Sequence, residues 1–369
     1  MQPENRRILY IVLVVIIVVL VITLGLVFGL KKKDDGEEKK TPADDDSDKI
    51  DVLNLYNNTE ELIQLFPVVY ATTVLPGIEK NIQNRLLTGF VNWNRGFKTW
   101  KAWGDILYTN ESIYNVQGAR LTLAHYQAAM DISLKRVDIQ MGKFHNMVIV
   151  DNYCGIHYDS INNGKTGTVM EFVKFKEYGN ETHPDTRVEE GWGGTKKESY
   201  YDFIKFQGED EKAKQNEQDE YNLKYVIPDE EDLKKKYIIK YNTSLIDENA
   251  DEILNITLKG FDSWNKGISY YLKWVEDFFD ENATSSSLEG IQRNKTQYKI
   301  EIQELFDKKN ITKLYFDNLL IRDNWTALHY RYRSQNLTNK EEVDVGDRME
   351  FFKFEEKEGN YTIVANWVK

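Results

Sequence analysis

Tryptophans recur at a fixed distance in this chain. Trp264 lies 171 residues after Trp93, and Trp274 lies 171 residues after Trp103. The surrounding words match too, because "GFVNWNRGFKTWKAW" at residues 89–103 corresponds to "GFDSWNKGISYYLKW" at residues 260–274. "DNYCGIHY" and "DNWTALHY" follow, then "MEFVKF" and "MEFFKF", in the same order. Matches that keep their order over most of both halves predict one structural unit used twice.

An uncharged apolar run precedes the repeats. It spans residues 8–30, 23 positions in all, and a helix needs about 20 to cross a bilayer. A cleaved signal peptide has a shorter apolar run. We therefore predict an uncleaved transmembrane signal-anchor. Positive charges flank the run on both sides and do not fix its orientation.

Eleven N-x-S/T sequons suggest the orientation. Such a density is typical of a glycosylated surface outside the cytosol, although an asparagine-rich composition is an alternative explanation. We expect a single-pass type II membrane glycoprotein, with residues 1–7 in the cytosol and the C-terminal region extracellular or lumenal. The predicted glycosylation sites are Asn57, Asn110, Asn180, Asn242, Asn255, Asn282, Asn294, Asn310, Asn324, Asn336 and Asn360.

Charge and cysteine content exclude some function classes. A net charge of −12 argues against a nucleic-acid partner, which needs a basic surface. Cys154 is the only cysteine, so no disulfide can form within the chain. No Cys and His cluster has the spacing of zinc ligands. The sequence therefore predicts no metal and no cofactor.

The order of apolar patterns predicts the domains. Residues 31–54 form a charged stalk, 55–206 the first unit, 207–227 a hydrophilic linker, and 228–369 the second unit. Apolar residues recur at helical spacing from Ile78 to Trp93, and two further helices follow. The period then changes to two, with a turn at Asp151 between two strands. Helices followed by hairpin-connected strands predict an α+β unit whose sheet is antiparallel, with helices on one face.

Four short motifs carry a family resemblance. "WNRG" and "WNKG" end the first helix of each unit, "CGIHY" and "ALHY" lie on a strand, "EFVKF" and "EFFKF" follow, and the last strands end in Trp192 and Trp367. This pattern resembles the SnoaL-like branch of the nuclear transport factor 2-like superfamily. The resemblance implies two tandem cones, each with three helices in the concave face of a curved sheet. Glu and Lys replace the family's usual Asp and Arg in the third motif.

Glu171 and Glu350 occupy the place of the family's acidic residue. Strand alternation puts them on the side of the inward apolar residues. A carboxylate at the apolar mouth of a cone has a raised pKa and can move protons. The alternative is a solvated carboxylate at the rim. The resemblance makes these two the candidate catalytic residues.

Aromatic and histidine pairs are the remaining candidates. Trp93, Tyr126, Trp264 and Tyr298 lie on helices that line the cones, as a ligand shelf or simply as core. His157 and His329 fall on the outer face of the sheet by alternation. The family commonly pairs two cones through this face, so we expect these histidines in an interface where the two units pack as a pseudo-dimer. Catalysis by these histidines and plain exposure on the outer face are the alternatives.

Three functions remain open. The first is a membrane-anchored glycoprotein whose units bind a small apolar ligand or a protein partner. The second is a cyclase- or isomerase-type enzyme with a pocket glutamate as general acid or base. The third is a non-catalytic scaffold whose cones are filled by their own side chains. The fold alone does not decide among them, and the absence of a dyad repeated on both inward faces favours the non-catalytic functions.

Overall fold

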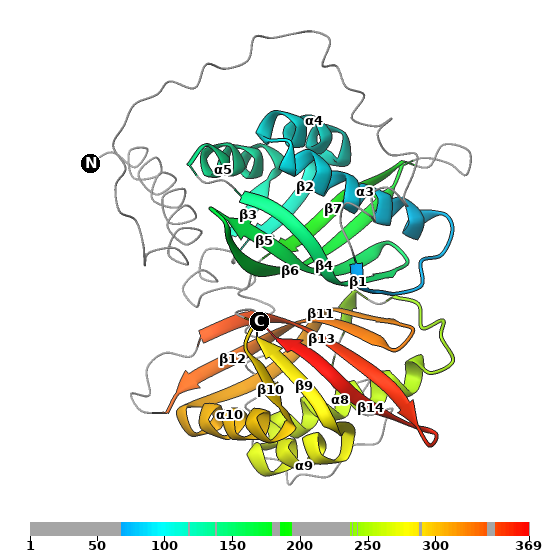
Figure 1. The fold of residues 1–369 in the computed structure, drawn as a ribbon, viewed down its shortest axis with the longest axis vertical. Coiled ribbons are helices and arrows are strands. Elements are labelled where there is room, and N and C mark those ends of the chain that lie inside the picture. Colours follow the sequence, from blue (N-terminus) through cyan, green and yellow to red (C-terminus); the bar gives the residue numbers. More distant parts are fainter. Residues whose placement is uncertain are drawn as a thin grey trace.

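The computed structural model describes residues 68–116, 119–136, 139–178, 185–193, 237, 239–241, 243–287, 290–337 and 344–368. The predicted tail, anchor, stalk and linker lie outside these ranges. Within them, no helix is both long and apolar enough to span a bilayer. Figure 1 shows two α+β units whose sheets face each other at the centre of the molecule, with helices on the two outer sides.

The first unit begins with a short strand, continues with two helices, and then alternates strands with one more helix. Its elements are β1 (Val68–Ala71), α3 (Ile78–Asn94), α4 (Phe97–Leu107), β2 (Tyr108–Val116), β3 (Ala119–Thr122), α5 (Leu123–Arg136), β4 (Ile139–Val150), β5 (Tyr153–Asn162), β6 (Lys165–Glu177) and β7 (Thr186–Gly193).

The second unit repeats this order. Its elements are β8 (Ile239–Tyr241), α8 (Ala250–Lys266), α9 (Ile268–Phe278), β9 (Phe279–Ser287), β10 (Gln292–Asn294), α10 (Lys295–Lys308), β11 (Lys309–Arg322), β12 (Trp325–Asn336), β13 (Asp344–Lys357) and β14 (Asn360–Val368).

Both sheets have seven strands and the same topology. The first has the order β1-β4-β5-β6-β7-β2-β3, and the second has the order β8-β11-β12-β13-β14-β9-β10. The prediction of an antiparallel sheet was wrong, because both sheets are mixed. β1 runs parallel to β4 and β2 runs parallel to β7, as do β8 with β11 and β9 with β14. The two strands of each parallel pair are not consecutive in the chain, because helices and other strands lie between them, so hairpin geometry does not fix their direction.

Glycine separates the first two helices of each unit. Gly96 and Gly267 have φ values of 110° and 113°, which a side chain with a Cβ rarely adopts. Their N–H groups donate to the carbonyl oxygens of Trp93 and Trp264 at 2.9 and 3.1 Å. The glycine in "WNRG" and "WNKG" therefore lets one helix end and the next begin in a new direction.

The helices of each unit pack on the concave face of its own sheet. Ile82, Phe90 and Trp103 meet Phe144 and Tyr158 in the first unit, and their counterparts do the same in the second. Phe90 stacks on Phe144 with ring centroids 4.4 Å apart, and Phe261 stacks on Phe316 at 4.0 Å. Each unit thus has its own apolar core, as the duplicated pattern requires.

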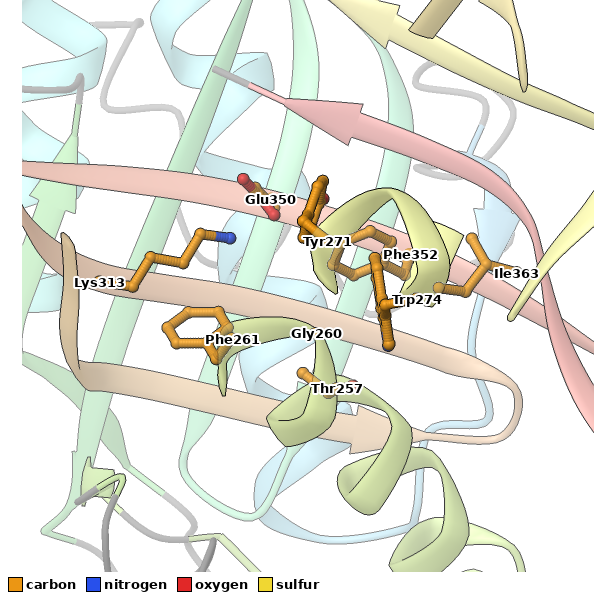
Figure 2. Close-up of a pocket in the computed structure, with 9 residues that line it drawn as sticks. All are labelled: Thr257, Gly260, Phe261, Tyr271, Trp274, Lys313, Glu350, Phe352 and Ile363. Carbon is orange, nitrogen blue, oxygen red and sulfur yellow. The ribbon is translucent and has the colours of Figure 1, made fainter. Parts of the chain in front are cut away.

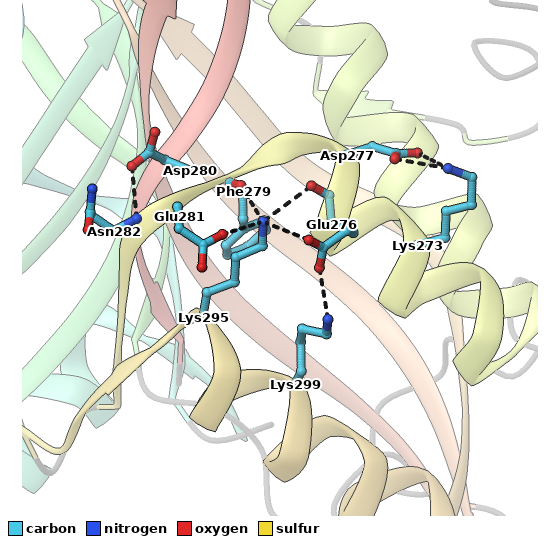
Figure 3. A network of polar contacts seen from close by, with 9 residues as sticks. All are labelled: Lys273, Glu276, Asp277, Phe279, Asp280, Glu281, Asn282, Lys295 and Lys299. Atoms are coloured by element: carbon cyan, nitrogen blue, oxygen red, sulfur yellow. Dashed lines mark hydrogen bonds and ion pairs between the residues drawn. The ribbon is translucent and has the colours of Figure 1, made fainter.

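The end of α9 is held by a lysine from the next helix of its unit. Lys295 donates from Nζ to the carbonyl oxygens of Phe279 at 2.9 Å and Glu276 at 3.2 Å (Figure 3). Its ammonium also pairs with the carboxylates of Glu276 and Glu281. A cation at the C-terminus of a helix satisfies its free carbonyl groups and its dipole. These contacts fix α10 against α9.

A third apolar cluster lies between the two sheets. Phe172 of the first unit and Phe351 of the second have ring centroids 6.2 Å apart, and each ring also stacks on the histidine of the other unit. The cluster consists of Val148, Val150, Tyr153, Met170, Phe172, Trp192, Leu320, Trp325, Ala327, Met349 and Phe351. Gly155 provides the close approach, because a Cβ there would lie 2.8 Å from the Cβ of Ala327.

The turns of the two units exchange hydrogen bonds. Asp151 accepts from the N–H of Ser244, and Asp323 accepts from the N–H of Thr73, both at 2.7 Å. The two aspartates occupy equivalent positions, as do Thr73 and Ser244, and the aspartates have φ values of 53° and 52°. The contact is therefore reciprocal, as expected of two similar units related by a pseudo-twofold axis.

One buried ion pair breaks this symmetry. Arg322 donates from Nη2 to Oε1 of Glu79 at 2.5 Å, and the two side chains are 1 % and 4 % exposed. Glu79 also accepts from the N–H groups of Leu75 and Asp151. The equivalent positions on the other side of the axis hold two apolar residues, Ala250 and Val150, both fully buried.

Candidate functional site

A small cavity lies inside the second unit, between its helices and the concave face of its sheet (Figure 2). Its volume is about 10 Å3, roughly the space that one water molecule needs. Most of its wall is apolar, but a lysine and a glutamate face it from neighbouring parts of the sheet. The lining residues are Thr257, Gly260, Phe261, Tyr271, Trp274, Lys313, Glu350, Phe352 and Ile363.

Lys313 is a buried cation on the inner face of β11, with 6 % of its surface exposed. Its Nζ lies 4.5 to 4.8 Å from the ring centroids of Phe261, Trp264 and Tyr330. Burial lowers the pKa of Lys313 to about 8, and the negative charge of Glu350 offsets part of that decrease. The rings compensate for lost hydration through cation–π attraction, so the ammonium form persists at neutral pH.

Glu350 lies on β13, on the same inner face. Its Oε1 accepts a hydrogen bond from the hydroxyl of Tyr330 at 2.5 Å. Burial, and next the charge of Glu350, raise the pKa of Tyr330 well above 10, so the phenol remains a donor. Tyr271 and Tyr298 form a hydroxyl pair at 2.9 Å. The inner face thus combines a carboxylate, an ammonium and phenolic hydroxyls among aromatic rings.

Two further polar residues face the same interior. Asn366 is fully buried, and neither its amide oxygen nor its amide nitrogen has a hydrogen-bond partner. It pairs across strands with Phe352 and Ser285, while the next residue, Trp367, packs in the layer between the sheets. Alternation therefore points Asn366 inward. The hydroxyl of Ser287, also on the inner side of β9, is buried without a partner.

The first unit is filled at the corresponding place. Tyr114 takes the position of Ser285 and Gly191 that of Asn366, and the Tyr114 ring lies directly on Gly191, where no Cβ could fit. The same ring stacks on Tyr126 at 4.4 Å. Met141 occupies the position of Lys313. Asn94 donates to the backbone oxygen of Met141, as the equivalent Asn265 does to that of Lys313.

The two predicted glutamates lie in matching surroundings. Glu171 accepts from Tyr158 at 2.9 Å as Glu350 does from Tyr330. Glu350 lines the cavity, but only in the second unit does a lysine accompany the carboxylate.

The four predicted lining aromatics are not among the residues that line this cavity. Trp93 and Trp264 donate from their indole N–H to the carbonyl oxygens of Ile139 and Ile311. Tyr126 stacks on Tyr114, and Tyr298 reaches the cavity wall only through its bond to Tyr271. All four therefore contribute to the cores.

His157 and His329 lie in the layer between the sheets, buried to 2 % and 0 % exposure. His157 bonds to Asn146 of its own sheet. His329 bonds to Asp347 at 2.9 Å. Burial lowers the pKa of His329, but the bond to Asp347 and the nearby carboxylate charges outweigh burial and raise it. Neither histidine faces the cavity.

The predicted sequons fall into three groups. Asn57, Asn180 and Asn242 lie outside the described residues. Asn255 and Asn324 are half-buried, and the threonines of their sequons, Thr257 and Thr326, are buried, so a glycan at either site has to be added before folding. Six are exposed: Asn110, Asn282, Asn294, Asn310, Asn336 and Asn360. Among the described side chains, no group of three His, Cys, Asp or Glu is arranged to hold a metal ion.

Lys313 and Asn366 were not predicted from the sequence. Lys313 stands in a strand whose counterpart has Met141, and Asn366 stands where the counterpart has Gly191. Matching residues of the repeat mark what the two units share. The signal for the cavity is where they differ, on inward positions that change from apolar or small to polar.

Comparison with solved structures finds similar folds. A ketosteroid isomerase-like protein from Erwinia carotovora atroseptica is 9 % identical with a TM-score of 0.28, covering 33 % of this chain and 96 % of that one. A putative polyketide cyclase from Xanthomonas campestris pv. campestris is 13 % identical with a TM-score of 0.28, covering 33 % and 91 %.

An NTF2-like protein of unknown function from Burkholderia pseudomallei is 8 % identical with a TM-score of 0.27, covering 32 % and 88 %. No protein-family model and no curated protein matches the sequence. The similarity concerns fold alone, and no activity or ligand is transferred from it.

Proposed function

We propose that this chain is a membrane-anchored binding protein made of two NTF2-like, SnoaL-like units. The second unit binds a small ligand and the first serves as its packing partner. One observation carries this proposal: the second unit has a cavity lined by Lys313 and Glu350, whereas the first unit has Met141 at the position of Lys313 and the Tyr114 ring packed on Gly191. Aromatic rings with a few polar groups are the usual lining of a small-molecule site, although this cavity has only about the volume of one water molecule, so its side chains have to move apart to admit a ligand.

The difference between the units supplies the test. Replacing Ser285→Tyr and Asn366→Gly together copies the filled interior of the first unit into the second. The full chain is screened by thermal shift against small apolar molecules, with and without charged groups. We expect stabilisation of the wild type and none of the filled variant. The control is Tyr114→Ser with Gly191→Asn, which alters the first unit alone. Equal responses from wild type and filled variant would contradict a site in the second unit.

A second candidate is an enzyme that moves a proton at a carbon beside a carbonyl group. The bond from Tyr330 to Glu350, with Lys313 nearby, favours it, because a carboxylate among such partners can serve as general acid or base. The test is exchange of such protons for deuterium in small ketones, followed by NMR. Loss of exchange in Glu350→Gln but not in Glu171→Gln would support catalysis, whereas exchange that both variants retain would exclude Glu350.

Anchoring and glycosylation complete the proposal. The apolar run at residues 8–30 and the six exposed sequons support an anchor with the two units outside the cytosol. Enzymatic removal of N-glycans is expected to increase gel mobility by many kilodaltons. Protease is expected to remove the two units when it is added to intact cells or to vesicles permeabilised so that it reaches the lumen. Protection under both conditions would overturn this orientation.

A further inference from the structure

His329 is fully buried between the two sheets, with a carboxylate on one side of its ring and an amide on the other. Its Nε2 donates to Asp347 at 2.9 Å, because an ionised carboxylate can only accept. Its Nδ1 lies 3.3 Å from Nδ2 of Asn318, and the amide oxygen of Asn318 is buried without a hydrogen-bond partner. The ring is neutral in this arrangement, and an unused acceptor lies on the amide beside Nδ1.

The first unit has the opposite amide orientation. There, Nδ1 of His157 lies 2.9 Å from the amide oxygen of Asn146, and an amide oxygen accepts from an N–H group. An amide can present either its oxygen or its nitrogen, so rotation of the Asn318 side chain would bring its oxygen to Nδ1 of His329. The site would then suit an imidazolium, which donates from both ring nitrogens.

The buried charges around His329 are not balanced. Asp317 and Asp347, on the two neighbouring strands, bring two carboxylates, and Arg331 brings one guanidinium. Nε of Arg331 donates to Asp317 at 2.5 Å. The formal charges of −1, −1 and +1 sum to −1. A buried charge without compensation is costly, and an imidazolium at His329 would neutralise this one.

The first unit covers the site with aromatic rings. Phe172 stacks on His329 with ring centroids 5.6 Å apart, and the centroid of Trp192 lies 6.0 Å away. Three more charges act at the rim, on Glu190, Arg120 and Lys240. The two cations are exposed, so water and salt screen them, whereas Glu190 is half-buried and adds to the negative excess. His329 is therefore buried only because the two units pack together.

We propose that His329 is a proton-binding site in the contact between the two units. As the pH falls through the neutral range, Nδ1 takes a proton from solvent, Asn318 turns its amide oxygen toward it, and the two units pack more tightly. This proposal does not depend on the ligand site of the second unit. A loss of the proton at higher pH leaves the buried carboxylates uncompensated and weakens the contact.

The direction of the pH effect follows from the charges. Burial lowers the pKa of His329, but the bond to Asp347 and the nearby carboxylates raise it above 6.5 overall. A pKa that is higher in the folded chain means that the stabilisation is complete below pH 6.5 and is lost as the pH rises through the folded value. Burial raises the pKa of Asp317 to about 6, so its own effect falls at lower pH.

The first test follows the imidazole signals of the full chain by NMR between about pH 5.5 and 8.5. The chain has five histidines, and His329 gives the signal that is missing from His329→Gln. We expect this signal to titrate above pH 6.5. Asp347→Asn, which keeps the shape but removes the charge, is expected to lower the pH at which it titrates. His157→Gln is the matched control, because Thr168 takes the position of Asp347 in the first unit, and it is expected to leave the titration of His329 unchanged.

The second test links the proton to the packing. Urea unfolding of the full chain at the same pH values is expected to give a wild-type midpoint that falls as the pH rises above 6.5. His329→Gln and Asp347→Asn are expected to lose most of that decrease, and His157→Gln to keep it. Groups such as Lys313 are common to all variants, so their effects cancel in this comparison.

Two results would overturn the proposal: a His329 signal that titrates at or below pH 6.5, or a His329→Gln variant whose midpoint falls with pH as steeply as that of the wild type. If His329→Gln does not fold, nuclear Overhauser contacts with the rings of Phe172 and Trp192 identify the signal in the wild type. The titration of the wild type beside Asp347→Asn then decides.

Discussion

The ion pair between Glu79 and Arg322 allows a sharp test of how the two sheets are held together. Glu79→Ala leaves a guanidinium buried without its carboxylate, and it also removes the acceptor of two backbone N–H groups. Breaking a buried pair by removing one partner costs about 3–5 kcal/mol. Arg322→Val is expected to cost slightly less, because the two N–H groups still support Glu79.

The double variant distinguishes pairing from packing. Glu79→Ala with Arg322→Val copies the apolar pair, Ala250 and Val150, that occupies the other side of the axis. It leaves no buried charge, so its cost is expected to be at least about 2 kcal/mol below the sum of the single costs. It does not fall to zero, because the N–H of Asp151 loses its acceptor, whereas the equivalent N–H of Asp323 is bound by Asp247.

Urea unfolding of the full chain, followed by tryptophan fluorescence, measures these differences. Lys101→Ala is the control, because its pair with Asp105 is solvent-exposed and is worth about 1 kcal/mol or less. Single costs below about 1 kcal/mol, or a double variant that loses the full sum, would refute the reasoning.

Three further predictions concern other parts of the fold. Lys313→Met is expected to stabilise the protein by about 1–3 kcal/mol at pH 7, since burial lowers the pKa of Lys313 to about 8 and the rings recover part of that cost. The sign follows from a pKa that is lower in the folded than in the unfolded chain: the cost is complete below pH 8 and disappears toward pH 10.5, so the gain should shrink over that range in unfolding curves. Gly191→Ala is expected to cost about 1–3 kcal/mol by overpacking, because its Cβ would overlap the Tyr114 ring, whereas Gly167→Ala meets no atom closer than 3.9 Å. Two results would argue against that packing: a Tm that Gly191→Ala leaves unchanged, or a lowered Tm that adding Tyr114→Ser does not restore. Asp151→Ala and Asp323→Ala are each expected to cost about 1–2 kcal/mol through a lost hydrogen bond and an unfavourable φ. Chemical unfolding that gives clearly unequal costs would show that the exchanged turns are not equivalent.

The repeat made much of the architecture predictable. Tryptophans at matching positions fix the first two helices, and alternation from Cys154 to Tyr158 separates residues of the core from those between the sheets. The strands β2 and β9 were not predicted. "FDENATSSS" has almost no apolar residues and therefore no alternating pattern that predicts a strand. Its strand conformation is stabilised by parallel pairing with β14.

The cavity was harder to predict than the fold. A lysine on a strand is normally assigned to the solvent side, and only the packing of α8 and α9 over β11 shows that Lys313 is enclosed. Asn366 lies on β14, which follows β13 in the chain and pairs with it in the sheet, but no pattern in the sequence marks its amide as enclosed. Glu350 was identified because the family pattern marks its position, whereas its partners follow no pattern.

The lone pair of Glu79 and Arg322 has a consequence for contacts between molecules. Because the two units are similar, the sheet of one unit could also pack on the same unit of a second molecule, first unit against first or second against second. In the first case two carboxylates would be enclosed opposite Val150, and in the second two guanidinium groups would be enclosed opposite Ala250. Neither arrangement offers a counterion, so each would bury two unpaired charges, and each charge would cost free energy. Divergence at four positions has therefore made the two units complementary rather than interchangeable. It favours packing between the two units of one chain over packing of a unit on the same unit of another molecule.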